Sequence, residues 1–200
     1  MRQPPRRHAV RQSGTTAIEF ALLATVFFTF MFGLLEVARA VFLWGTLQEV
    51  TRHAARAAAL TDFTDAAAVS ALRRAAIFRD SAGPLLLADP VDDSYVRIDY
   101  LSQDAGGATA LVDPGGSCPR QNLINCAADP HGAACIALVR ARLCLPTSAP
   151  GACDPVPYAP MVGLLTPWFA SAGAPIHLPT APTVAVAESF GYRPGAPGCP

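Results

Sequence analysis

The stretch Arg11-Gln-Ser-Gly-Thr-Thr-Ala-Ile-Glu-Phe20, followed by the apolar run Ala21–Leu35, decides how this chain is organised. A basic leader precedes it, and the Gly14-Thr15 junction and a single carboxylate, Glu19, stand just ahead of the apolar residues. No charged residue interrupts the apolar run. Together these parts predict a protein that is handled at a membrane surface, cut there and displayed outside the cytoplasm.

The length and charge of the chain limit what it can be. Its 200 residues, 52% of them hydrophobic, have room for one membrane segment and one modest domain. The net charge of +0 implies no general attraction for nucleic acid, so we expect no nucleic-acid partner. The leader carries no acid and four arginines, which are Arg2, Arg6, Arg7 and Arg11. By the positive-inside rule, the N-terminus is expected in the cytoplasm and everything after the apolar run on the far side.

One long helix is predicted through the apolar run and beyond it. Phe20–Leu35 alone would span only ~24 Å of a hydrocarbon core ~30 Å thick. Val37–Leu47 continues the run past Glu36 and Arg39, which are spaced to pair on one helical face. An apolar stripe then follows at steps of three and four residues, through Val37, Val41, Trp44, Leu47, Thr51, Ala54 and Ala58. We therefore expect a helix over about 15–60, with its first half in the membrane and its second half packed on a domain.

The rest of the chain predicts a small α+β domain. A second helix is expected over Ala66–Phe78, with Asp62, Thr64 and Asp65 as residues that favour helix starts. Strands are expected over Tyr95–Leu101, Cys135–Leu145 and Thr183–Phe190. Ala105–Ala134 reads as a disulfide-held loop, Met161–Trp168 as a short helical piece and 191–200 as a tail. This order predicts a long helix laid across a small antiparallel sheet.

All six cysteines follow the apolar run: Cys118, Cys126, Cys135, Cys144, Cys153 and Cys199. An even number confined to the exported part predicts disulfides formed in an oxidising compartment such as the periplasm. The spacing does not fix which cysteines pair. His131 lies four residues before Cys135, but the short Cys-x-x-Cys spacing of common zinc sites is missing. We expect neither a metal nor a cofactor.

Glu19 needs a physical explanation because a carboxylate at the bilayer centre costs up to ~2.5–3.5 kcal/mol, and less near an edge. One interpretation places it at the head-group boundary, where the positive end of a helix favours an acid. The other supposes a cut between Gly14 and Thr15. The new α-amine is largely protonated at neutral pH and lies one helical turn from Glu19, on this chain or on a neighbouring one.

Gly14 followed by Thr-Thr-Ala-Ile-Glu19-Phe20 resembles the processing site of type IV pilins, where a prepilin peptidase cuts after the glycine. The longer pattern resembles the TadE-like minor pseudopilins of tight-adherence (Flp) pilus systems. It comprises Gly14-Thr-Thr-Ala-Ile-Glu-Phe-Ala-Leu-Leu, Gly33-Leu-Leu-Glu-Val-Ala-Arg-Ala-Val-Phe42 and Thr51-Arg-His-Ala-Ala-Arg-Ala-Ala-Ala59. The resemblance covers roughly residues 11–60, and Leu178–Arg193 resembles the family more loosely.

The resemblance implies a membrane-anchored pilus-assembly protein without catalytic activity. It implies a cytoplasmic leader over 1–14, a transmembrane and assembly helix over 15–47, and a periplasmic domain over 48–200. The implied partners are the bacterial inner membrane, a prepilin peptidase, other pilins or pseudopilins and the assembly platform. Gly14 and Thr15 would form the processing site, and Glu19 with Phe20 the part of the helix that meets an N-terminal amine.

Three other interpretations stay open at the level of sequence. Ala38-Arg39-Ala40 satisfies the small-x-small rule for a secretory signal peptide, which would make this a secreted disulfide-rich protein. A single-pass binding protein with an ordinary anchor would share the topology without a cut at Gly14. An enzyme is the third, since Glu49, His53 and Arg56 share a helical face, but Gly-x-Ser-x-Gly and His-Glu-x-x-His do not occur.

Overall fold

The fold is described by a computed structural model over residues 15–161, 163 and 176–193. Over these residues the chain forms three α-helices, one 3₁₀ turn and four strands, which confirms the predicted α+β class. In chain order they are α1 (Thr15–Leu60), α2 (Ala66–Ala76), a 3₁₀ turn (Asp93–Tyr95), β1 (Val96–Gln103), β2 (Thr109–Leu111), α3 (Pro119–Ala128), β3 (Leu138–Leu143) and β4 (Thr183–Val186).

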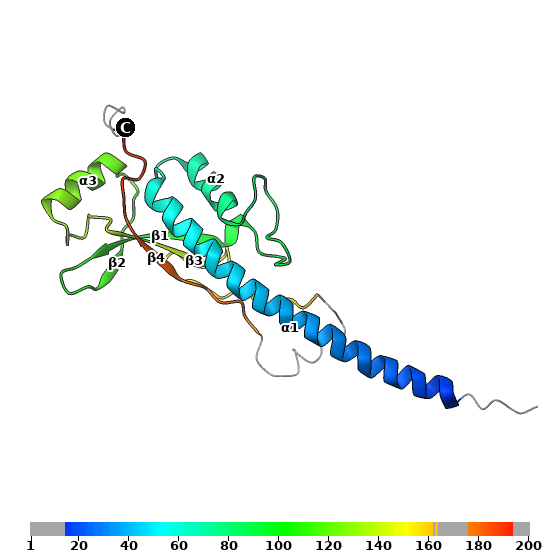
Figure 1. The fold of residues 1–200 in the computed structure, drawn as a ribbon. Helices are drawn as coiled ribbons and strands as arrows, with labels where there is room; N and C mark the ends of the chain where they lie inside the picture. The colour runs from blue at the N-terminus through cyan, green and yellow to red at the C-terminus, as the bar shows by residue number, and fades with distance from the viewer. Residues whose placement is uncertain (1–14, 162, 164–175, 194–200) are drawn as a thin grey trace, which may run out of the picture.

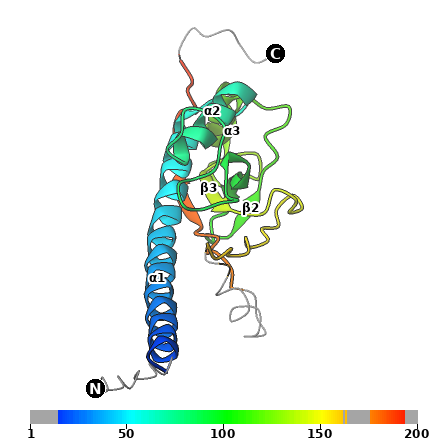
Figure 2. The same cartoon turned by 90° about the vertical axis from the view of Figure 1, so that its right-hand side faces the viewer.

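Helix α1 dominates the shape of the molecule. It runs unbroken for 46 residues, or about 69 Å at 1.5 Å per residue, with the bounds that the sequence predicts. Its C-terminal half lies along the domain and its N-terminal half projects beyond it (Figures 1 and 2). The domain therefore packs on the C-terminal half of α1 only.

The sheet follows the order β2-β1-β3-β4 over the described residues, with antiparallel neighbours throughout. Helix α1 contacts β3 and β4, the strands at one side of this order. Val96 and Tyr100, which the predicted alternation places on one face of β1, belong to the core, but burial along the strand does not alternate strictly because Asp99 and Leu101 are buried as well. On the opposite face, the Asp99 carboxylate accepts Arg142 Nη2 at 2.7 Å and Arg140 Nη2 at 3.2 Å. The face of the sheet under α1 is thus apolar, and the opposite face carries this charged group together with the buried Leu101.

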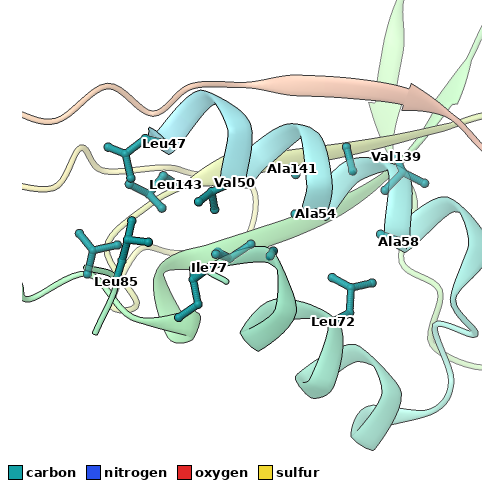
Figure 3. Packing of buried hydrophobic residues seen from close by; sticks show 14 of the residues in the cluster. Leu47, Val50, Ala54, Ala58, Leu72, Ile77, Leu85, Val139, Ala141 and Leu143 are labelled. Carbon is teal, nitrogen blue, oxygen red and sulfur yellow. The ribbon is translucent and has the colours of Figure 1, made fainter. Parts of the chain in front are cut away.

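The core forms where α1 crosses the sheet, as Figure 3 shows. Buried side chains come from α1, α2 and β3, among them Leu47, Val50, Ala54, Ala58, Leu72, Val139, Ala141 and Leu143. The alanines on α1 carry little side-chain volume, so the sheet approaches the helix backbone closely. Thr51 is also buried, and its Oγ1 lies 2.9 Å from Thr183 Oγ1 on β4.

The predicted stripe on α1 is correct for its second part and wrong for its first. Leu47, Thr51, Ala54 and Ala58 are buried, whereas Val37, Val41 and Trp44 are exposed. The face that meets the domain runs through Glu36 and Leu43 instead. Consecutive residues lie about 100° apart around a helix, so the first three positions are rotated off this face. The sequence favours the apolar stripe, whereas the domain covers the face with Glu36 and Arg39, whose charges pair with each other and with loop groups.

The start of α2 is confirmed in detail. The Asp65 carboxylate accepts the N–H groups of Ala67 and Ala68 at 2.9 and 3.0 Å, which caps the helix. The helix ends at Ala76, two residues before the predicted end. The Ala-rich sequence thus predicts the helix correctly, and only the predicted position of its C-terminal end is imprecise.

The prediction of a loop over Ala105–Ala134 is wrong, since this segment contains β2 and α3. Cys118 is the N-cap of α3, and Pro119 follows in its first turn. Buried Asn122 accepts the Ile136 N–H at 2.8 Å and donates to the Ile136 carbonyl at 3.3 Å. A tertiary contact therefore holds a helix whose composition is typical of a loop.

Two disulfides occur within the described part of the chain. Cys126–Cys135 joins α3 to the segment before β3, and Cys144–Cys153 closes the loop after β3. No described cysteine is a free thiol, and Cys199 lies outside the described residues. Most of the helical piece expected over Met161–Trp168 and of the tail also lies outside them.

Leu47→Ala should lower the free energy of unfolding by about 2–5 kcal/mol, because it removes a fully buried side chain and leaves a cavity. Denaturant unfolding of the full chain in detergent measures the loss. Leu60→Ala is the matched control on the same helix, since Leu60 is more than half exposed. Equal losses for the two variants would contradict the packing described above.

Candidate functional site

The N-terminal half of α1 presents an apolar surface that nothing in the described chain covers. Every Ile, Leu, Val, Phe and Met side chain from Ile18 to Leu35 is exposed. Among the described helices, α1 is the one long and apolar enough to cross a membrane, and none of its most apolar window is buried. A helix of a soluble core would bury this surface, so the exposed half is consistent with membrane anchoring.

The length of this exposed surface matches a bilayer. Residues 16–35 span about 30 Å at 1.5 Å per residue, the thickness of the hydrocarbon core. Two hydroxyls in the middle of it are satisfied by the helix itself: Thr25 Oγ1 donates to the Ala21 carbonyl and Thr29 Oγ1 to the Thr25 carbonyl, each at 2.8 Å. Neither Thr25 nor Thr29 therefore needs a water molecule as a hydrogen-bond partner, and this is what a position in lipid requires.

The predicted processing and pairing residues lie at the N-terminal end of this half. Thr15 is the first residue of α1, and Gly14 lies outside the described residues. Glu19 and Phe20 are exposed, and no salt bridge to Glu19 occurs in the part of the chain that the structure describes. Thr15 and Glu19 are four residues apart in one helix, so they stand on the same side of it.

A buried polar cluster marks the other end of the apolar half. We call Glu36, Arg39 and Tyr158 the exit cluster. Arg39 Nη1 lies 3.0 Å from Glu36 Oε1, as the spacing predicts, and the Tyr158 hydroxyl also donates to the Glu36 carboxylate. Arg39 donates further to the carbonyls of Leu87 at 2.8 Å and Ala159 at 2.9 Å. Glu36 is only 4% exposed, so the carboxylate is withdrawn from solvent.

The electrostatics of the exit cluster explain why it is stable. A buried carboxylate is costly unless it is paired and hydrogen-bonded, and here both conditions are met. The Arg39 guanidinium also lies 5.2 Å from the centre of the Tyr158 ring, within the range of a cation–π contact. Burial, and next the hydrogen bond to Glu36, raise the pKa of Tyr158 to about 12, so its hydroxyl stays a neutral donor. The cluster therefore fastens two distant loops to α1.

Sequence reasoning found only part of this cluster. The Glu36 and Arg39 pair is visible from its i, i+3 spacing, whereas Tyr158 lies 122 residues from Glu36 and carries no local signal. Tyr158 is followed by the carbonyl of Ala159 and the N–H of Met161, which also contact the pair. Only the folded chain brings these groups together.

The residues considered for catalysis or metal binding form no buried site. Glu49 lies 3.2 Å from His53 and 3.5 Å from Arg52, but all three side chains are about half exposed. Arg56 is exposed as well. No group of three metal-ligating side chains occurs in the described residues, where Cys135 is in a disulfide. His131 Nδ1 instead lies 3.3 Å from the Gln103 carbonyl oxygen.

A comparison with known families supports the resemblance seen in the sequence. Residues 14–56 match the model of the family described as TadE-like protein, as predicted. A match to this family suggests a Tad pilus-associated membrane protein with an N-terminal apolar helix. The matched part runs from the leader junction through most of α1 and includes Glu36 and Arg39. No curated protein and no solved structure matches the chain.

Arg39→Met should lower the free energy of unfolding by about 3–5 kcal/mol, because it leaves the buried Glu36 carboxylate without its cation. The change is measured by denaturant unfolding in detergent.

Arg52→Met is a closely matched control, since Arg52 pairs with Glu49 at the same i, i+3 spacing on the same helix. These two side chains are 55% and 49% exposed, against 9% and 5% for the buried pair. Arg52→Met should therefore cost less than about 1 kcal/mol. Similar losses in the two variants would show that the exit cluster does not hold the loops.

Proposed function

We propose that this chain is a minor pseudopilin-like, membrane-anchored component of Flp/Tad pilus biogenesis. The observation that carries the proposal is one uninterrupted helix whose first half is exposed and apolar and whose second half is built into a domain. The family match, which begins at the leader junction, supports it. In this proposal 1–14 is a cytoplasmic leader, 15–47 the anchor and assembly helix, and 48–200 a domain in the periplasm.

The leader is removed after Gly14 by a prepilin peptidase. The cut creates an α-amine on Thr15, which carries a positive charge at neutral pH. Glu19 lies one helical turn away and is exposed, so it is available to that amine or to the amine of a neighbouring chain. The pairing offsets the cost of keeping a carboxylate at the membrane, and it favours one axial register between packed helices.

Assembly then proceeds through side-by-side packing of α1 with the helices of other pilins or of the assembly platform. Gly33 and Gly45 support this step, because a Cβ built at either position would meet nothing within 4 Å in this chain. Internal packing therefore gives no reason for a glycine at these sites. Small residues on a membrane helix let a second helix approach closely.

The topology follows from charge and cysteine chemistry. Four leader arginines without an accompanying acid favour a cytoplasmic N-terminus in the bacterial inner membrane. The disulfides Cys126–Cys135 and Cys144–Cys153 suit an oxidising compartment, which the periplasm provides. Both observations support a domain on the periplasmic side.

The exit cluster argues against the main alternative, a secretory signal peptide cut after Ala40. Such a cut would remove Glu36 and Arg39 from the mature protein, and with them both charged partners of the Tyr158 hydroxyl. It would also separate the apolar half of α1 from the half that forms the core. A single-pass protein that keeps its leader differs only in the state of the Gly14-Thr15 bond.

Gly14→Ala should leave the leader attached, because the added methyl group occupies the position where the peptidase requires glycine. Mass spectrometry of the protein purified from membranes should then show the extra mass of residues 1–14, while the wild-type chain should begin at Thr15.

Gly33→Ala is the matched control, since it makes the same change at an open site in α1 and should be processed normally. A Gly14→Ala protein trimmed like the wild type would rule out this processing step. A wild-type N-terminus at Val41 would support the signal-peptide alternative instead.

Glu19→Gln should reduce the number of pili while leaving the amount of protein in the membrane unchanged. The amide keeps the shape of the side chain but cannot form an ion pair, and it lowers the cost of insertion. Pili are counted by electron microscopy and the membrane fraction is measured by immunoblot. Glu49→Gln removes an exposed carboxylate on the same helix and should leave both values unchanged. Normal piliation in Glu19→Gln would restrict Glu19 to a head-group boundary role.

A further inference from the structure

We infer that the domain is seated directly on the bilayer, through an apolar collar beside α1 where the helix leaves the membrane. The collar consists of Leu86 and Leu87 in the loop between α2 and β1, Met161 after the exit cluster, and Val37 on α1. Its occupant is the lipid head-group region. The inference deepens the proposed function, because it rests on α1 being the membrane anchor.

The loop that carries Leu86 and Leu87 has a defined structure that turns these two side chains outward. Its buried residues, Leu85, Ala88 and Val91, belong to the core, and three short backbone hydrogen bonds join them. Leu86 is 72% exposed and Leu87 is 45% exposed. Leu87 also has φ of 60°, in the left-handed region that an ordinary side chain disfavours. Folding thus fixes two leucines in contact with the surroundings.

The collar lies at the height of the exit cluster. The Leu87 carbonyl accepts Arg39 Nε at 2.8 Å, and the Met161 N–H donates to Glu36 Oε1 at 3.4 Å. These helix positions follow the exposed apolar half, which ends at Leu35, by one to four residues or about 6 Å at most. The head-group region on each side of the hydrocarbon core is roughly 5–7 Å thick. Leu87 and Met161, whose backbones make these contacts, therefore fall within that region when residues 16–35 span the core, and Leu86 adjoins them.

The attachment of the domain keeps the collar at this height. The C-terminal half of α1 is part of the core, and the exit cluster fastens the collar loops to the same helix. The domain cannot swing away from the membrane without breaking these contacts. The backbones of Leu87 and Met161 contact α1 one to four residues after Leu35, where the exposed apolar half ends, and Val37 is exposed on α1 at the same height. Apolar side chains therefore continue along the helix axis from the membrane-spanning half to the collar. Lipid is the occupant that this continuity favours over a second protein.

The charges near the collar do not select anionic lipid. A hollow beside Leu86 and Leu87 is lined by Arg39 and Arg79, and also by Asp89. Arg39 is paired with Glu36, which leaves one cation and one carboxylate facing the hollow. Vesicles of zwitterionic phosphatidylcholine are therefore a sufficient probe.

Depth-dependent quenching in such vesicles tests the inference. The full chain, with its native disulfides oxidised, carries one added cysteine labelled with an environment-sensitive fluorophore, and the lipids carry nitroxides at the head group or on the acyl chain. Leu86→Cys reports the collar and Val26→Cys reports the membrane-spanning half. Ile124→Cys is the control, because Ile124 is an exposed apolar residue on α3, at the end of the domain far from the N-terminal half of α1 (Figures 1 and 2).

The label at position 86 should be quenched most by head-group nitroxides, at least about twofold more than the label at 124, because only the collar lies in the head-group region. The label at 26 should be quenched most by acyl-chain nitroxides. Strong quenching at 26 with equal, weak quenching at 86 and 124 would overturn the collar while leaving the anchor intact. This result is also expected if a second copy covers the collar. Weak quenching at all three positions would overturn the anchor itself.

Discussion

A single α-helix here has to satisfy two different surroundings, and the rest of the structure depends on that constraint. Up to Leu35 the helix exposes apolar side chains on every side, as a hydrocarbon solvent demands. From Leu43 onward it buries one narrow face against the sheet. The backbone hydrogen bonds continue unchanged through this transition. Glu36 and Arg39 stand at the transition, where a charged pair is tolerated because Tyr158 and two loop carbonyls complete its hydrogen bonds.

Much of the fold was predictable because its signals are local. The bounds of α1, the Asp65 cap of α2 and the placement of Val96 and Tyr100 on one face of β1 depend on residues a few positions apart. The features that were not predicted depend instead on residues far apart in the sequence. Helix α3 depends on Asn122 reaching the Ile136 backbone, and the pairing of the cysteines depends on how α3 meets β3. The face of α1 that is buried near Val37 was also missed, because the burial of Glu36 depends on Tyr158, which lies 122 residues away in the sequence.

The candidate site also has one part that local sequence signals predict and one part that depends on residues distant in the sequence. Its membrane-facing part follows from composition and from the resemblance, which the family match over residues 14–56 supports. Its domain-facing part depends on Tyr158 and on the loop around Leu87, which are distant in sequence and become neighbours of Arg39 only on folding. A sequence can therefore indicate that a chain is anchored while leaving open how its domain meets the membrane.

Because α1 is one continuous helix, a displacement or rotation of its membrane half is transmitted to the domain. The helix has no proline, and its far end is clamped into the core. A neighbouring helix that packs against the membrane half would set both the height of the domain above the membrane and its rotation about the helix axis. A shift of one residue along a helix corresponds to about 1.5 Å along the axis and 100° of rotation around it. The contacts made near Glu19 would thus determine which side of the domain looks outward, some 40 residues away.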